Sequence, residues 1–294
     1  MKADPKVVAI TAGTPTVMGF TADLRRIAGK QFVDVGIAEE HAVALASGIA
    51  ARGGKPVFGV FSSFIQRAYD QLSQDLCINN NPALLLVYMG SLSGMNDVTH
   101  LGFFDIPLLS NIPNMVYLAP TNRDEYLAML RWGLHQTAHP VAIRVPVAPL
   151  NPASGDVDTD YATLNKYRVT HRGSRVAILA LGAFYTLGET VSAKLRSEQG
   201  IDATLVNPRY ISGVDTALLD ELKDDHQIVV TLEDGALDGG WGEKIARYYA
   251  TAATRVLNYG ASKQFVDRYD RAAFLRQNRL TDAQIAEDVT ALLG

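Results

Sequence analysis

The stretch FVDVGIAEEHAV, residues 32–43, decides the fold of this chain. An apolar, strand-like segment passes through a turn at Gly36 into an amphipathic helix, and Glu39 stands at the junction. In open α/β sheets, ligands bind at such strand-to-helix junctions. If apolar walls enclose the Glu39 carboxyl group, it can donate or share a proton at neutral pH. The alternative is a carboxylate that only favours the helix dipole.

A second stretch of the same kind, VFGVFSSFIQRAYDQ, covers residues 57–71. A short β-type run leads into a helix, and Phe61 and Phe64 flank two serines at the change of structure. Two aromatic rings at the edge of a sheet could form a stacking platform for a flat heteroaromatic ring. Aromatic residues at such positions also serve as ordinary core residues, so both interpretations stay open.

Strand-like and helix-like segments alternate along the whole chain. In the first part we expect strands at 7–11, 57–61, 83–89, 115–119 and 141–145, and helices at 39–52, 63–79 and 122–135. In the second part we expect strands at 176–180, 203–207, 228–232 and 256–259, and helices at 186–199, 215–223, 242–251 and 281–293. Such alternation predicts an α/β fold of two consecutive domains, each a mostly parallel sheet flanked by helices. We place these domains at residues 1–150 and 166–294, joined by a polar linker at 151–165.

Composition agrees with this organisation. A chain of 294 residues suggests about two domains, and 48% hydrophobic residues are ample for packed cores. The net charge of −4 gives no indication of nucleic-acid binding. We recognise neither a membrane-spanning apolar run nor a signal peptide. The single cysteine, Cys77, excludes an internal disulfide and suits a reducing compartment. We therefore expect a cytoplasmic protein that binds neither nucleic acid nor membrane.

Several motifs in a shared order resemble the thiamine-diphosphate enzymes of the transketolase family. They are VDVGIAEEHAV at 33–43, FSSFIQRAYDQ at 61–71, THLGFFDIPLLSNIPNMVYLAP at 99–120 and VTLEDGALDGGWG at 230–242. The resemblance covers nearly the whole chain and is strongest to the second half of deoxyxylulose-5-phosphate synthases. It implies a pyrimidine-binding domain followed by a transketolase C-terminal domain. It also implies transfer of a two-carbon ketol or acyl unit from a ketose or 2-oxo acid donor to an aldehyde acceptor.

The resemblance further implies which residues form the site. Glu39 would be the carboxylic acid that hydrogen-bonds the aminopyrimidine ring of thiamine diphosphate. Phe61 and Phe64 would line the pocket of that ring, and Arg67 would lie close to it. His100 would face the substrate, because an imidazole can donate to a hydroxyl or oxyanion near neutral pH. The alternatives are a solvated helix residue for Arg67 and a structural loop residue for His100.

Three positions depart from the synthase pattern. Asn96 stands where the family has an aspartate, and Met89 and Val147 stand where it has arginines that bind the acceptor phosphate. An amide cannot serve as a carboxylate base but can orient a hydroxyl, so Asn96 stays a tentative substrate residue beside His100. Without the arginines the strongest bidentate anion anchors are lost. We therefore expect a less charged acceptor than glyceraldehyde 3-phosphate, or a phosphate that is held elsewhere.

The sequence contains no Gly-Asp-Gly segment followed by an asparagine at the spacing of the thiamine-diphosphate metal site. We therefore expect no metal ligands in this chain, and we expect a separate diphosphate-binding domain or subunit to hold the diphosphate and Mg²⁺. The chain alone should be inactive, and it should assemble as a homodimer or a heterotetramer. The pair Asp234-Gly235 is typical of a turn. The run Gly239–Gly242 is typical of a helix start and gives a weak signal for an anion site.

Two other functions stay open at this point. The β subunit of a 2-oxo acid or acetoin dehydrogenase shares the two domains and the glutamate, although the THLGFFDIPLLSNIPNM segment favours the synthase branch. A non-catalytic regulatory subunit would explain the departures at positions 89, 96 and 147. That role would not need Glu39, Phe64 and His100 together. Under the catalytic readings the substrates are small sugars or 2-oxo acids.

Overall fold

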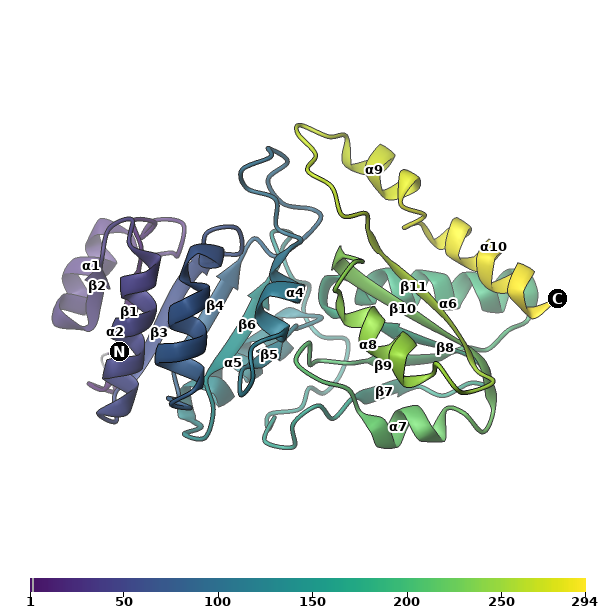
Figure 1. Cartoon of the computed structure of the whole chain (residues 1–294), viewed down its shortest axis with the longest axis horizontal. Coiled ribbons are helices and arrows are strands. Elements are labelled where there is room, and N and C mark those ends of the chain that lie inside the picture. Colours follow the sequence, from purple (N-terminus) through teal and green to yellow (C-terminus); the bar gives the residue numbers. More distant parts are fainter. Residues whose placement is uncertain (2) are drawn as a thin grey trace.

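The computed structural model describes residue 1 and residues 3–294, and it contains two β-sheets that lie side by side (Figure 1). The first sheet has the strand order β2-β1-β3-β4-β6-β5, with every neighbouring pair parallel. Its strands are β1 (Val7–Thr11), β2 (Phe32–Asp34), β3 (Lys55–Phe61), β4 (Leu84–Tyr88), β5 (Val116–Leu118) and β6 (Val141–Val145). The second sheet has the order β11-β10-β8-β9-β7, and only its edge strand β7 pairs antiparallel. Its strands are β7 (Arg168–His171), β8 (Arg175–Ala180), β9 (Thr204–Asn207), β10 (His226–Ala236) and β11 (Arg255–Ala261). The predicted α/β architecture is confirmed.

Helices cover both faces of the first sheet. They are α1 (Ala22–Ala28), α2 (Glu39–Ala51), α3 (Tyr69–Gln71), α4 (Asp105–Ser110) and α5 (Arg123–His135). Successive side chains of a strand point to opposite faces. In β4, accordingly, Leu85 and Val87 lie in the core that includes α2, whereas Leu84 and Leu86 lie in the core that includes α5. Because both faces are covered, β4 reads in the sequence as one continuous apolar run.

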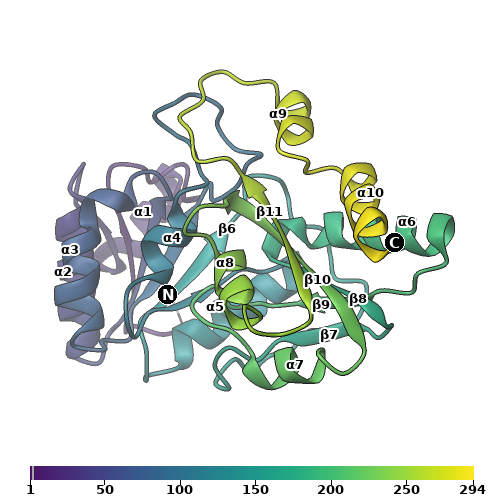
Figure 2. The ribbon, with the colours of Figure 1, turned by 45° about the vertical axis from the view of Figure 1, so that its right-hand side comes forward.

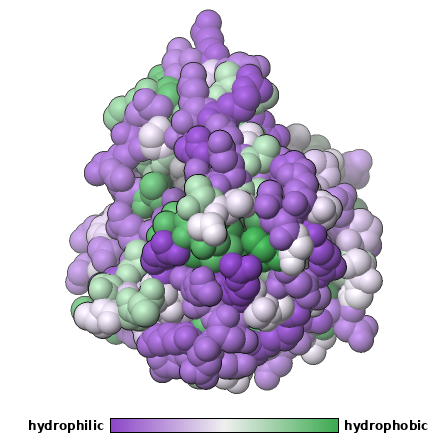
Figure 3. Space-filling view, turned by 90° about the vertical axis from the view of Figure 1, so that its right-hand side faces the viewer, coloured by the Kyte–Doolittle hydropathy of each residue, from purple (hydrophilic) through white to green (hydrophobic). Residues whose placement is uncertain are grey.

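The second sheet is covered in the same way. Its helices are α6 (Tyr185–Gln199), α7 (Thr216–Glu221), α8 (Trp241–Tyr248), α9 (Arg271–Gln277) and α10 (Asp282–Leu293). In β8, Ile178 packs with α6 and α10, which run beside each other (Figure 2), and Leu179 packs with α7 and α8. The face that carries the C-terminal end of α10 is mostly hydrophilic, with a hydrophobic area near its centre (Figure 3).

The two halves share one hydrophobic core. Ile106 of α4 and Trp241 of α8 come from different halves and are buried in the same cluster. The polar segment 151–165 between the sheets is mostly exposed but is anchored to the first half at Tyr161. Its Tyr161 is buried, and the ring lies 5.9 Å from that of Trp132 in α5. The relative position of the two sheets is therefore set by packing, and not only by the chain that connects them.

The segment 63–79 is not the single helix that the sequence predicted. It consists of a 3₁₀ turn (Ile65–Ala68), the short α3 and a π-helix (Leu72–Cys77). The carbonyl of Asp75 accepts hydrogen bonds from Ser47 Oγ (2.6 Å) and Asn79 Nδ2 (2.9 Å). Side-chain donors that enter a helix ladder in this way disturb its regular spacing. Cys77 is buried here.

Other differences also have local causes. Helix α1 was not predicted because it has no buried residue and therefore no apolar stripe. The edge strand β7 and helix α9 were not predicted either. Asp234-Gly235 lies inside β10 and not in a turn, so that prediction was wrong. The reason is that β10 continues through an irregularity after Leu232 and pairs with β11 again at Ala236.

Candidate active site

Glu39 is the first residue of α2, and a turn that ties two strand ends together fixes its position. Asp34, at the end of β2, accepts hydrogen bonds from the N–H groups of Gly13 (2.9 Å) and Gly36 (3.0 Å). Both glycines have positive φ, 73° and 69°, a conformation that a residue with a Cβ rarely adopts. The chain then enters α2 with the Glu39 side chain buried.

One oxygen of the Glu39 carboxylate is left without a hydrogen-bond donor. Glu39 is 2% exposed, and its Oε2 has no hydrogen-bond partner among the residues that the structure describes. Arg67 Nη1 lies 3.4 Å from this oxygen, and Arg67 Nε lies 3.4 Å from Glu40 Oε2. Buried polar atoms normally have partners because leaving them bare costs free energy. The Glu39 carboxyl group is therefore suited to a hydrogen bond with a group from outside this chain.

A cavity of about 300 Å³ opens beside Glu39. The residues that line it are Ala12, Gly13, Thr14, Ile37, Glu39, Ser63, Phe64, Gln66 and Arg67. Phe64 supplies its aromatic wall. Phe61 does not line the cavity but packs edge-on against Phe64, with ring centroids 5.0 Å apart. The cavity has the volume and the mixed apolar and charged lining of a small-ligand site.

His100 lies beside the aromatic pair, nearer to Phe64 than to Phe61, and a carboxylate orients it. Its ring centroid is 5.3 Å from that of Phe64, edge-on. His100 Nδ1 lies 2.8 Å from both Asp97 Oδ1 and Thr99 Oγ1. Since the Thr99 hydroxyl gives its single proton to Asp97 (2.5 Å), Nδ1 acts as a donor, and in the neutral imidazole Nε2 is then an acceptor. Hydrogen bonds from Thr99 and His100 lower the pKa of Asp97 to about 2.

The structure brings Glu39, Phe64, Arg67 and His100 into one region but turns Asn96 elsewhere. Asn96 is exposed, and its Nδ2 donates to the carbonyl of Tyr269 in the second half of the chain (3.2 Å). Its amide nitrogen is thus engaged by the protein itself.

Met89 and Val147 both lie near Gly94. A Cβ at Gly94 would lie 3.1 Å from Val147 Cγ2 and 3.6 Å from the Met89 carbonyl oxygen. Met89 follows β4 in the left-handed region, with φ 63°, and its carbonyl accepts from Ser62 Oγ (3.2 Å). The two positions where the synthase pattern has arginines are therefore close in space.

The helix start after Gly240 is closed to an external anion, because a carboxylate of this chain occupies it. Glu233 in β10 accepts hydrogen bonds from the N–H groups of Trp241 and Gly242, both at 2.8 Å. Burial raises the pKa of Glu233 to about 7, against the opposite effect of these hydrogen bonds. The weak sequence signal for an anion site was therefore wrong.

A buried charge network joins the two halves next to the loop of His100. Arg144 of β6 donates to both carboxylate oxygens of Asp105 (2.7 and 3.2 Å) and to the carbonyls of Gly102 (3.1 Å) and Asp234 (2.6 Å). Asp105 also accepts from the Tyr117 hydroxyl. The network fixes the chain just after His100 between β6, α4 and β10.

Sequence reasoning missed Asp97 as the partner of His100, although a signal was present. The spacing of DVTH, with the aspartate three residues before the histidine, is typical of a turn closed by an Asp side chain. No sequence signal points to Arg144 and Asp234, which are far apart in the chain. In the part of the chain that the structure describes, no group of three or more His, Cys, Asp or Glu side chains is placed to bind a metal, and no helix is long and apolar enough to cross a membrane.

Comparison with known proteins places this geometry in a family. Residues 1–152 match the model of the transketolase pyrimidine binding domain, and residues 165–285 match that of the transketolase C-terminal domain. The 1-deoxy-D-xylulose-5-phosphate synthase of Clostridium perfringens (strain SM101 / Type A) is 40% identical over 84% of this chain and 39% of its own length. The synthase of Azoarcus sp. (strain BH72) is 34% identical over 99% of this chain and 45% of its own length. The chain thus spans less than half the length of these curated relatives.

Solved structures share the fold at lower sequence identity. A split-gene transketolase, described as an inactive β4 tetramer, superposes with a TM-score of 0.82 at 21% identity, over 99% of this chain and 93% of its own. The transketolase of Pichia stipitis in complex with sedoheptulose 7-phosphate gives a TM-score of 0.78 at 16% identity, over 98% of this chain and 43% of its own. Fold, motif order and family models agree. This chain belongs to the transketolase family and consists of its pyrimidine-binding and C-terminal parts.

Proposed function

We propose that this chain supplies the pyrimidine-binding and C-terminal parts of a thiamine-diphosphate-dependent transferase of the deoxyxylulose-5-phosphate synthase or transketolase type. The complete enzyme moves a two-carbon ketol or acyl unit from a ketose or 2-oxo acid to an aldehyde. A diphosphate-binding domain, on the same or a separate polypeptide, completes the site. The division into residues 1–150, 151–165 and 166–294 is part of this proposal.

The observation that carries the proposal is the buried Glu39 carboxylate, whose Oε2 has Arg67 Nη1 3.4 Å away but no hydrogen bond from the residues that the structure describes. A carboxyl group at this place, at the mouth of a cavity with an aromatic wall, fits an aminopyrimidine ring that offers a ring nitrogen for proton sharing. Phe64 would line the pocket of that ring, and Phe61 packs edge-on against Phe64. Arg67 is half-exposed, lines the same cavity and lies 3.4 Å from Glu39 Oε2. When bound, thiamine diphosphate supplies the electron sink of the reaction.

His100 is the second catalytic residue of the proposal. Asp97 and Thr99 engage Nδ1, so Nε2 is free to accept a proton from a substrate hydroxyl and return it. Asn96 lies in the same loop; one N–H of its side-chain amide is engaged by the Tyr269 carbonyl, so its second N–H and its Oδ1 are the atoms it could offer to a substrate.

We expect the acceptor substrate to differ from that of ordinary deoxyxylulose-5-phosphate synthesis. Met89 and Val147 offer no charge beside Gly94, whereas a bound phosphate needs charge-assisted donors. We propose an acceptor without a phosphate, or one whose phosphate is held by the missing domain. Comparing glyceraldehyde with glyceraldehyde 3-phosphate in the complete enzyme decides between them.

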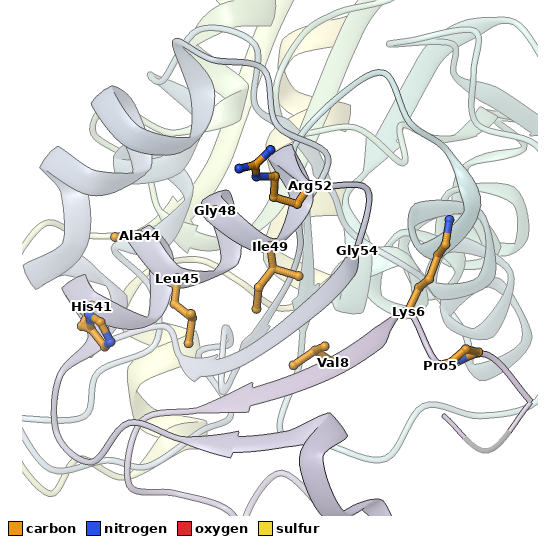
Figure 4. A pocket seen from close by; sticks show the side chains of 10 residues that line it. All are labelled: Pro5, Lys6, Val8, His41, Ala44, Leu45, Gly48, Ile49, Arg52 and Gly54. Carbon is orange, nitrogen blue, oxygen red and sulfur yellow. The ribbon is translucent and has the colours of Figure 1, made fainter.

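We also propose where the diphosphate-binding domain docks. An open hollow lies between α2 and β1, lined by His41, Ala44, Leu45 and Gly48 of the helix and by Lys6 and Val8 at the strand (Figure 4). A cofactor that touches Glu39 and is held by its diphosphate and Mg²⁺ on another domain requires that domain to contact the chain near α2. Small residues such as Ala44 and Gly48 allow a close approach there. Assembly as a homodimer or heterotetramer follows the symmetry of most such complexes.

The test is calorimetric titration of thiamine diphosphate with Mg²⁺ into the chain alone, and into the chain mixed with the N-terminal, diphosphate-binding part of a related synthase. We expect no binding to the chain alone and tight binding to the mixture, lost in Glu39→Ala. Tight Mg²⁺-dependent binding to the chain alone would contradict the shared site. A Glu39→Ala complex with full turnover would favour the non-catalytic alternative.

A further inference from the structure

The loop that carries His100 is held by a segment from the far end of the chain. Residues 91–100 follow β4, and residues 262–270 follow β11; both project from the top of the molecule in Figures 1 and 2. Hydrogen bonds join them along their length. The Tyr269 hydroxyl donates to the Leu92 carbonyl (2.9 Å), and the Arg268 N–H donates to the Asn96 carbonyl (2.6 Å). The two segments therefore form one structural unit.

The most informative of these contacts reaches the peptide next to Asp97. The Val98 N–H donates to Asp267 Oδ1 (3.1 Å), and the carbonyl of the same peptide unit, that of Asp97, accepts from the His100 N–H (3.1 Å). This peptide plane is thus held from both sides. The Asp97 side chain is attached next to this peptide plane. The orientation of the plane therefore determines where the Asp97 carboxylate meets His100 Nδ1.

We infer that Asp267 is a positioning residue for His100. Its carboxylate fixes the Asp97–Val98 peptide, which aims the Asp97 carboxylate at Nδ1 and leaves Nε2 as the free acceptor. The second half of the chain thereby sets the state of a side chain in the first half. Only the catalytic importance of this inference rests on the proposed function. The effect of Asp267 on the tautomer of His100 can be measured in the chain alone.

The side chain of Asp267 is suited to this task and poorly suited to a packing role. Asp267 is exposed, like its neighbours from Ser262 to Phe265, and Phe265 is 81% exposed. Replacing Asp267 by alanine therefore removes little buried apolar surface and should leave the fold intact. An asparagine at this position retains a carbonyl oxygen that accepts from the Val98 N–H.

The experiment is nitrogen NMR of the chain labelled with ¹⁵N-histidine, which reports the tautomer of each imidazole through its ring nitrogens. The His100 signals are identified by their loss in His100→Gln. The spectra are recorded above the titration range of histidine for the wild type, Asp267→Ala, Asp267→Asn and the control Lys263→Ala. Lys263 is an exposed residue of the same segment.

We expect His100 in the Nδ1–H form in the wild type, in Asp267→Asn and in Lys263→Ala. In Asp267→Ala roughly half or more of the His100 signal should move to the Nε2–H form that free imidazole prefers. An Asp267→Ala spectrum identical to the wild type would overturn the inference, as would an equal change in Lys263→Ala. Failure of cofactor binding in the mixed complex would refute the proposed function and leave this result standing.

Discussion

Replacing Arg144 by methionine tests how strongly the two halves depend on their shared charge network. Arg144 is 4% exposed and makes charge-assisted hydrogen bonds to Asp105 together with bonds to two carbonyls, those of Gly102 and Asp234. Methionine fills the space of the arginine stem but offers no donor. Two carboxylates, on Asp105 and Asp234, then stay buried without their cation.

The cost follows from what the carboxylates can do. Removing one partner of a buried ion pair costs about 3–5 kcal/mol of unfolding free energy. Protonation limits that cost. Neutralising one of the two carboxyl groups, with the reference pKa of 3.9, requires about 4 kcal/mol at pH 7 and about 1.5 kcal/mol at pH 5, and the resulting carboxylic acid can donate a hydrogen bond to the other carboxylate. We therefore expect Arg144→Met to lose about 4 kcal/mol at pH 7 and about 2 kcal/mol at pH 5.

Urea denaturation of the wild type, Arg144→Met and the control Arg123→Met at both pH values measures this difference. Arg123 carries the same charge on an exposed helix, 3.5 Å from Asp124, so its replacement should change stability by less than about 0.5 kcal/mol. A loss below about 1 kcal/mol for Arg144→Met at pH 7 would refute the reasoning. So would a loss that does not diminish at pH 5, because it would come from packing alone.

Three further predictions concern single residues. Gly48→Leu should keep the fold, because a Cβ at this position meets nothing within 4 Å and leucine favours helix. It should nevertheless weaken cofactor binding by the mixed complex at least about tenfold, because the side chain would obstruct the proposed docking surface. Unchanged titration isotherms would refute that surface. Burial raises the pKa of the Cys77 thiol to about 12, so Ellman's reagent at pH 8 should react only after unfolding, and fast reaction of the native chain would show that this helix opens. The pKa of Asp97 is lowered from 3.8 to about 2, so its contribution to stability is present above pH 4 and is lost as the pH falls through about 2. The stability difference between the wild type and Asp97→Asn, followed by acid unfolding, should shrink over that window, and a constant difference would contradict the assignment.

The fold was largely predictable because its signals are local. Strands such as β4 are buried on both faces and read as apolar runs, and helices such as α5 and α10 begin at side chains, Asn122 and Thr281, that accept from the first turn. Helix α1 escaped prediction because no residue of it is buried. The region 63–79 escaped because its irregular ladder depends on Ser47, a donor from another helix.

The candidate site was predictable only in part, and the division follows distance along the chain. Glu39, Phe64 and Arg67 lie within thirty residues of one another, in two strand-to-helix turns whose pattern is visible in the sequence. The missing hydrogen bond at Glu39 Oε2, however, results from burial, which no sequence pattern reveals. Asp97 and Thr99 orient His100 from its own loop, but the residues that hold this loop come from β6, β10 and the segment after β11, and only the fold brings them together.

This distribution has a physical consequence for how the family's site tolerates change. Contacts within one turn, such as Asp34 to Gly13 and Gly36, survive as long as the first sheet forms. Contacts to the His100 loop need both sheets in register, because Leu92 is held by Asp234 of β10 (2.8 Å) as well as by Tyr269. Any perturbation that shifts the second sheet against the first therefore reaches His100 before it reaches Glu39. The part of the site around Glu39, proposed to meet the cofactor, should then be robust, and the part around His100, proposed to meet the substrate, should be adjustable.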